Sequence, residues 1–149
     1  MLAMAAFARG AETPSILLFG GAGTSPNDVA AVEAILKDNQ LTYAKVNSEE
    51  LKGMSEAQLM AYKLLIIPGG NFIDVGQGLT PDTFTTIRKA IEGGLNYYGI
   101  CAGAFLAGDG GKYYSSLNLT KGVRFGFYSA EAQGFRKTSV AIAGDKLRT

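Results

Sequence analysis

Short apolar runs alternate along the first hundred residues with longer segments in which apolar positions recur at helical spacing. Four runs are typical of strands: 15–21, 41–47, 63–71 and 95–100. Three segments predict helices: 25–39, 55–62 and 80–94. Because helices separate successive strands, the pattern predicts an α/β fold with a mostly parallel sheet that helices cover on both faces.

The first predicted helix has a clear start signal. Ser25 is placed as the N-cap, Pro26 takes the first helical position, and Asp28 follows three residues after the cap. Four apolar side chains are expected to share its buried face: Val29, Val32, Ile35 and Leu36. Ser55 and Gln58 form a second capping pattern, and Thr80-Pro81 begins the third helix.

The remainder of the chain is expected to belong to the same single domain, 1–149. Beyond Gly108 the sequence alternates without a clean helical period, which predicts antiparallel strands appended to the sheet as a C-terminal extension. Residues 1–14 are expected to be an N-terminal arm or the remnant of an export signal, since residues 1–8 are apolar but lack a basic start. The compartment, cytoplasmic or exported, stays open.

Composition narrows the class of partner. Fourteen Lys and Arg balance thirteen Asp and Glu, for a formal charge of +1 with no long run of either sign. This balance argues against a nucleic-acid surface, and no apolar run is long enough to span a membrane. We therefore expect a small-molecule ligand or a partner protein, with no cofactor and no metal, and we leave the oligomeric state open.

Three glycine-containing turns follow Phe19, Ile67 and Ile100, and all should lie at the carboxyl edge of the sheet, where ligands bind in such folds. The first turn, 20–25, lacks the spacing of a dinucleotide loop, so its glycines favour a sharp turn into the helix. Free amides near Gly21 could still hold an anion. In the second turn, Gly69 and Asn71 are further candidate ligand-binding residues, because glycine lets backbone amides point into a site.

The third turn contains the only cysteine of the chain, Cys101. It follows a predicted strand, and its neighbours Gly99, Ala102, Gly103 and Ala104 are all small. Small neighbours are required where a strand turns sharply into a helix and presents a nucleophile with a strained backbone. The alternative is that Cys101 is a buried, inert side chain, as lone cysteines commonly are. The clustering of small residues favours the strained turn.

The pair "LLIIPGGN" and "YYGICAGAFLAG" resembles the class I glutamine amidotransferase-like superfamily, and "GICAGAFLAG" is most similar to the biotin-protein ligase N-terminal domain family. The resemblance spans about residues 15–108. It implies a flavodoxin-like three-layer sandwich, Cys101 as nucleophile, and amides of Gly70 and Ala102 as an oxyanion hole. In active members, a late histidine and an acidic residue serve the cysteine.

The chain has no histidine, which sets it apart from those active members. A cysteine hydrolase needs a base to form the thiolate and an acid to protonate the leaving amine, and histidine does both near neutral pH. Four carboxylates are the acidic candidates: Glu12, Glu33, Glu131 and Asp145. None replaces histidine well as a proton donor to an amine.

Three interpretations follow. The first is an amidotransferase-like domain that binds a ligand or partner at Cys101 without complete glutaminase activity. The second is a cysteine-dependent amide hydrolase whose histidine lies outside this chain. The third is a thiol-redox protein of the same fold, which requires an acidic residue close to the thiol that the sequence cannot place.

Overall fold

Four parallel strands form the sheet in the computed structural model of the chain, which describes residues 14–125. The strands lie in the order β2-β1-β3-β4 and are β1 (Ile16–Phe19), β2 (Tyr43–Val46), β3 (Leu64–Ile67) and β4 (Asn96–Gly99). The predicted α/β fold with a parallel sheet is confirmed. Residues 1–13, which make up almost all of the expected arm or signal remnant, lie outside the described residues. Residues 126–149 also lie outside them.

Six helices are seen in this part of the chain: α1 (Pro26–Asp38), α2 (Ser48–Lys52), α3 (Glu56–Met60), α4 (Phe72–Gly78), α5 (Pro81–Glu92) and α6 (Ala102–Ala107). The three helices predicted from periodicity correspond to α1, α3 and α5. Helices α2 and α4 were not predicted, because each is too short to display a full apolar period, and α4 contains two glycines.

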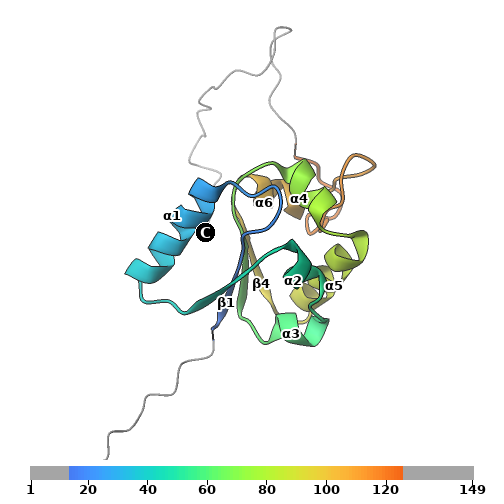
Figure 1. The fold of residues 1–149 in the computed structure, drawn as a ribbon. Helices are drawn as coiled ribbons and strands as arrows, with labels where there is room; N and C mark the ends of the chain where they lie inside the picture. Colours follow the sequence, from blue (N-terminus) through green and yellow to red (C-terminus); the bar gives the residue numbers. More distant parts are fainter. Residues whose placement is uncertain (1–13, 126–149) are drawn as a thin grey trace, which may run out of the picture.

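The two faces of the sheet are covered unequally. Figure 1 shows α1 on one face, with the other described helices gathered on the opposite face. The core beneath α1 is small, built on Leu18, Val32 and Ile66. The larger core holds fully buried side chains from α2 to α6, including Leu51, Phe84 and Leu106. Both helical layers predicted from the sequence are therefore present.

Helix α1 corrects one detail of the sequence analysis. Val29, Val32 and Leu36 are buried as predicted, but Ile35 is 60% exposed. Successive residues of an α-helix are rotated by about 100°, so Ile35 lies well away from the stripe that contacts the sheet. The expected four-residue apolar face is a three-residue face.

The segment after α6 also differs from the prediction. Within 109–125 the chain forms turns and no strand, while the remainder of the predicted antiparallel extension lies outside the described residues. Positive φ angles interrupt any extended run at Gly111, Asn118, Lys121 and Gly122. The segment is nonetheless part of the core, because Leu117 is fully buried and its amide donates to the carbonyl of Leu106.

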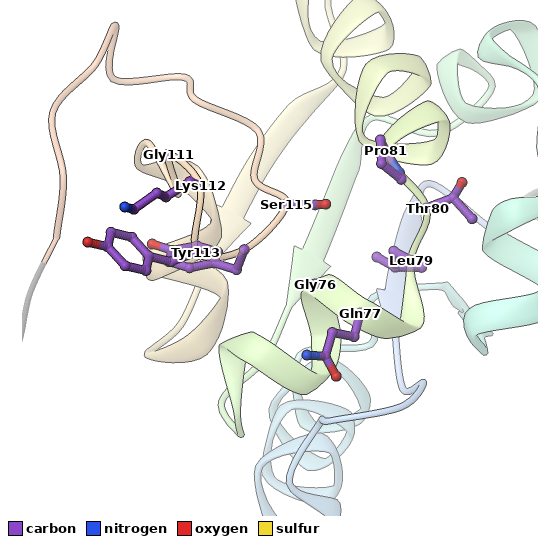
Figure 2. A pocket seen from close by; sticks show the side chains of 10 residues that line it. Gly76, Gln77, Leu79, Thr80, Pro81, Gly111, Lys112, Tyr113 and Ser115 are labelled. Carbon is purple, nitrogen blue, oxygen red and sulfur yellow. The ribbon is translucent and has the colours of Figure 1, made fainter.

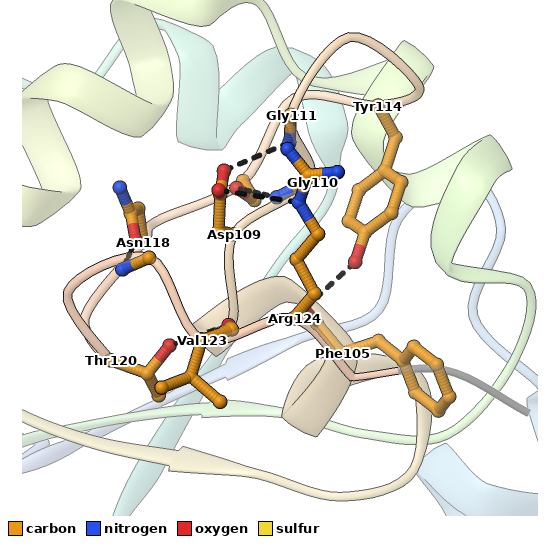
Figure 3. A network of polar contacts seen from close by, with 11 residues as sticks. Phe105, Asp109, Gly110, Gly111, Tyr114, Asn118, Thr120, Val123 and Arg124 are labelled. Carbon is orange, nitrogen blue, oxygen red and sulfur yellow. Dashed lines mark hydrogen bonds and ion pairs between the residues drawn. The ribbon is translucent and has the colours of Figure 1, made fainter.

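A polar network closes this segment on itself (Figure 3). Asp109 accepts a hydrogen bond from the Gly111 amide at 2.9 Å and pairs with Arg124 at 3.5 Å. The Tyr114 hydroxyl donates to the carbonyl of Phe105 in α6. Burial raises the pKa of Tyr114, with a further contribution from the charge of Asp109, so this donor keeps its proton. The network fixes the 109–124 turns against α6.

Glycine is required where β4 passes beneath α6. A β-carbon on Gly99 would lie 2.5 Å from the backbone carbon and oxygen of Gly103 and 2.7 Å from the nitrogen of Ala104. A β-carbon on Gly103 would in turn overlap the carbonyl oxygen of Ile67. The small residues around Cys101 thus allow strand and helix backbones to touch directly.

We predict that Gly99→Ala lowers the free energy of unfolding by about 1–3 kcal/mol, because the added methyl meets backbone that cannot move aside without displacing α6. Urea denaturation measures the change. Gly53→Ala is the matched control, since a β-carbon there makes only ordinary contacts at 3.5 and 3.6 Å and φ is −79°. Equal stability of the Gly99 variant and the unsubstituted protein would contradict the crowding.

Candidate functional site

The three turns predicted to share the carboxyl edge of the sheet do meet there. An isolated antiparallel bridge joins Thr24 of the first turn to Gly70 of the second. The Ser25 amide donates to the Gly69 carbonyl and the Asn71 amide to the Gly23 carbonyl, each at 2.8 Å. The turns after β1 and β3 therefore form one rigid backbone surface.

Cys101 lies beside that surface, between β4 and α6. Its side chain is exposed, and its backbone has φ 49° and ψ −103°. This conformation is rare for a residue with a side chain and costs on the order of 1–3 kcal/mol. The strained strand-to-helix backbone favoured for Cys101 is observed, and the alternative of a buried side chain is excluded by its exposure.

Hydrogen bonds on both sides hold the strained residue in place. Before Cys101, the Ile100 amide donates to the Ile67 carbonyl at 3.0 Å. After it, the Gly103 amide donates to the Ile100 carbonyl at 2.9 Å, and the Phe105 amide donates to the carbonyl of Cys101 itself at 3.1 Å. A residue fixed from both sides can keep a conformation that it would not adopt alone.

Tyr97 anchors the helix from beneath. Its hydroxyl donates to the carbonyl of Gly103 at 2.7 Å, directly at the start of α6. Burial raises the pKa of Tyr97 well above the usual tyrosine value, so the hydroxyl remains a donor across the physiological pH range. The strand that leads into Cys101 thus also fixes the helix that leaves it.

Several backbone amides near Cys101 have no hydrogen-bond acceptor in the described part of the chain, and two of them matter for the sequence prediction. They are the amides of Gly70 and Ala102, the two positions that the sequence resemblance assigned to an oxyanion hole. Gly70 adopts φ +148°, a conformation that residues with side chains rarely take. A β-carbon on its neighbour Gly69 would lie 3.5 Å from the Cys101 β-carbon, which places this turn against the cysteine.

Asn71 and Gly21, two further candidate ligand-binding residues, each stabilise the local structure. The Asn71 side chain accepts from the amides of Ile73 and Asp74 and so caps α4. A β-carbon on Gly21 would overlap the Phe19 ring and the Ser48 hydroxyl, so packing explains this glycine. Most amides of the first turn bond within the protein, as those of Gly20, Ala22, Thr24 and Ser25 do. Binding of an anion there stays a prediction.

Within residues 14–125, an acidic residue that the sequence analysis placed only as a capping residue, Asp28, lies close to Cys101. A β-carbon on Gly69 would overlap the Asp28 carboxylate while contacting the Cys101 β-carbon, so both side chains border the same small space. Glu33 lies elsewhere, where it accepts from the Tyr43 hydroxyl at 3.0 Å and pairs with Lys45 at 3.3 Å. The Tyr43 hydrogen bond, more than the charge of Lys45, holds the pKa of Glu33 low.

The remaining acidic candidates lie outside the described residues: Glu12, Glu131 and Asp145. The signal that could have found Asp28 is its place in the first turn of a helix that starts at the carboxyl edge. Its proximity to Cys101 also depends on the order of the strands, which the sequence does not display.

Two cavities lie near this edge of the molecule. One, of about 350 Å³, lies between the first turn and the Glu33–Lys45 pair, and Gly21 lines it. A larger one, of about 500 Å³, lies between the end of α4, the start of α5 and residues 111–115 (Figure 2). Lys112 and Tyr113 border the larger cavity, and Cys101 lines neither.

Within 14–125, no group of three His, Cys, Asp or Glu side chains is arranged to hold a metal ion. No helix in that range combines the length and the apolar character that crossing a bilayer requires.

Comparison with known proteins gives one family and one fold. The family described as "Biotin-protein ligase, N terminal" matches residues 14–137. Among solved structures, the chain is similar to the "Putative Peptidase E Protein" from Listeria monocytogenes EGD-e, with a TM-score of 0.52 and 20% identity. The similarity covers 70% of this chain and 62% of that one. No curated protein matches.

The structural similarity, at 20% identity, establishes the fold alone and agrees with the flavodoxin-like sandwich expected from the sequence. The family match covers most of the chain and includes all three turns at the carboxyl edge together with Cys101. On this match, the chain is a member of the biotin-protein ligase N-terminal family.

Proposed function

We propose that this chain is an amidotransferase-like domain that binds a small carbonyl-containing ligand at Cys101 and does not complete glutamine hydrolysis. The observation that carries the proposal is the exposed Cys101 thiol on a strained backbone at φ 49°, between β4 and α6. Strain of this kind persists where the surrounding structure enforces it, and such sites cluster where ligands are bound or transformed. Membership of the family agrees with a ligand-binding role.

The amides of Gly70 and Ala102 support a carbonyl ligand in particular. Neither donates a hydrogen bond within residues 14–125, and the turn that carries Gly70 lies against Cys101. A thiolate that attacks a carbonyl carbon leaves negative charge on the oxygen, and free backbone amides are suitable donors to that oxygen. In our proposal, Cys101 is the nucleophile and these two amides are its oxyanion hole.

Hydrolysis needs more than these parts. After attack on an amide, the leaving nitrogen must receive a proton, and general acid–base catalysis of this kind contributes about 10²–10⁴ in rate. The chain contains no histidine, the residue that usually supplies this proton near neutral pH, and the acidic side chain beside Cys101 in the described residues is Asp28. We therefore propose that the ligand is held, reversibly or covalently, rather than turned over.

We predict that the 149-residue chain does not release ammonia from glutamine at an enzymatic rate, although iodoacetamide alkylates Cys101 in the native protein. Ammonia release should equal that of the Cys101→Ala variant, because that variant lacks only the thiol. Turnover above about 1 s⁻¹ that is lost in Cys101→Ala would contradict the proposal and favour a cysteine-dependent hydrolase. A thiol that remains unlabelled in the folded protein would contradict the exposed nucleophile.

Reversible oxidation of Cys101 is the second candidate function, and the position of Asp28 favours it. This role requires an acidic residue close to the thiol, and Asp28 borders the same space as Cys101. In the reaction, the thiolate attacks one oxygen of hydrogen peroxide, an S–O bond forms, the O–O bond breaks, and hydroxide leaves and takes a proton from solvent to become water. The product is a sulfenic acid that a thiol can reduce again.

This second role predicts a dimedone adduct on Cys101 after brief treatment with hydrogen peroxide, which mass spectrometry locates. Dithiothreitol added before dimedone should prevent the adduct, because it returns the sulfenic acid to the thiol. Cys101 that stays a free thiol under peroxide, or that passes only to irreversible acids, would exclude reversible oxidation.

A further inference from the structure

We infer that Asp28 determines which ligands reach Cys101, selecting small molecules that present a cationic or N–H-donating nitrogen beside the carbon that the thiol engages. The inference rests on the proposed function, since it assigns a specificity residue to that same site. Three observations support it: the Asp28 carboxylate lies next to Cys101, it has no hydrogen-bond donor in the described residues, and Lys45 is paired with Glu33.

The carboxylate and the cysteine lie on either side of Gly69. A β-carbon at this glycine would overlap the Asp28 carboxylate and lie 3.5 Å from the Cys101 β-carbon. The Asp28 carboxylate therefore occupies the space over Gly69 that a side chain would fill, next to the Cys101 β-carbon. A ligand bound to the exposed thiol therefore lies beside the Asp28 carboxylate.

The Asp28 carboxylate does not make the hydrogen bond that is usual at its position in a helix, because the expected donor, the Ser25 amide, bonds to Gly69. In a capping box, the Glu or Gln side chain at the third helical position accepts a hydrogen bond from the amide of the N-cap residue. Helix α2 forms this reciprocal pair through Asn47 and Glu50, and α3 forms it through Ser55 and Gln58. In α1 the Ser25 hydroxyl accepts the Asp28 amide, but the Ser25 amide donates to the Gly69 carbonyl at 2.8 Å instead.

The bond from Ser25 to Gly69 has two consequences. It ties the turn after β1 to the turn after β3, and it leaves the Asp28 carboxylate without the donor that the corresponding residues of α2 and α3 have. No hydrogen bond or ion pair to this carboxylate is found within residues 14–125. The hydrogen bond from Ser25 to Gly69 therefore joins the two turns and also leaves the Asp28 carboxylate able to accept hydrogen bonds from a ligand.

An ionised carboxylate accepts hydrogen bonds but donates none. It attracts ammonium and amide N–H groups and repels carboxylates, phosphates and sulfonates. Lys45 on β2 is paired with Glu33 of the same helix as Asp28. The chemistry around Cys101 thus favours amine- or amide-bearing ligands over anionic ones.

Two thiol reagents of opposite charge test the inference. Both 2-aminoethyl and 2-sulfonatoethyl methanethiosulfonate react when the Cys101 thiolate attacks the sulfenyl sulfur. A disulfide forms, the S–S bond of the reagent breaks, and methanesulfinate leaves. The two reagents share this leaving group, so the ratio of their rate constants cancels the thiolate fraction of Cys101 and reports the charge beside it.

We predict that Asp28→Asn lowers the ratio of cationic to anionic rate constants by about tenfold, because it removes one unit of charge within a few ångströms of the reacting sulfur. Asp38→Asn is the matched control, since it removes the same charge from the last residue of the same helix. Ten residues along a helix are about 15 Å, beyond the screening length at physiological salt. The control should leave the ratio unchanged within about twofold.

The outcomes separate the inference from the function on which it rests. No reaction of the unsubstituted protein with either reagent would overturn the proposed function. Reaction with a ratio that is the same in Asp28→Asn, or that falls equally in Asp38→Asn, would overturn the role of Asp28 and leave the proposed function standing. Thermal unfolding verifies that each variant is folded, and Asp28→Ser replaces Asp28→Asn if the latter is not.

Discussion

The direct contact between the backbones of β4 and α6 is the constraint on which the site depends. Gly99 and Gly103 touch without intervening side chains, and Gly103 also lies against the Ile67 carbonyl. Only Ile100 and Cys101 connect this closely packed strand and helix, and Cys101 adopts a positive φ. The strain at Cys101 thus accompanies this packing, and the hydrogen bonds of Ile100, Gly103 and Phe105 maintain it.

A second set of contacts determines what surrounds the thiol. The bond from the Ser25 amide to the Gly69 carbonyl joins two turns that are more than forty residues apart in sequence, and it removes the usual capping partner of Asp28. The same turns leave the amides of Gly70 and Ala102 without acceptors in the described part of the chain. An exposed thiol, two amides without acceptors and a nearby carboxylate thus lie together at one edge of a parallel sheet.

Much of the fold could be predicted from local signals in the sequence. Ser25-Pro26 and Thr80-Pro81 mark the starts of α1 and α5, and the run of aliphatic residues before Pro68 marks β3. Helix α4 escaped prediction because glycines interrupt its apolar pattern and its main start signal is the Asn71 cap. Antiparallel strands were expected in 109–125, where positive φ angles and the burial of Leu117 produce turns instead.

The part of the site that depends on neighbouring residues in the sequence was predictable, and the part that depends on distant residues was not. The strained turn at Cys101 follows from small residues that adjoin it in the sequence, so a local pattern was sufficient. The proximity of Asp28 to Cys101 depends on the order of the strands and on the hydrogen bond from the Ser25 amide to Gly69. Both involve residues far apart in the sequence, so a local pattern does not reveal them. Glu33 was considered because it is acidic, but its partners Tyr43 and Lys45 on β2 hold it elsewhere.

The central claim is that Cys101 binds a carbonyl ligand whose oxygen is held by the amides of Gly70 and Ala102. Its most direct test is the chemical shift of these two amide protons when acetaldehyde adds to Cys101 and forms a hemithioacetal, with the Cys101→Ala protein as reference for reaction elsewhere. The account predicts that both protons move downfield as they acquire an acceptor, while the Gly53 amide, which already donates within α2, does not move. An adduct on Cys101 that leaves the Gly70 and Ala102 amides unshifted would contradict it.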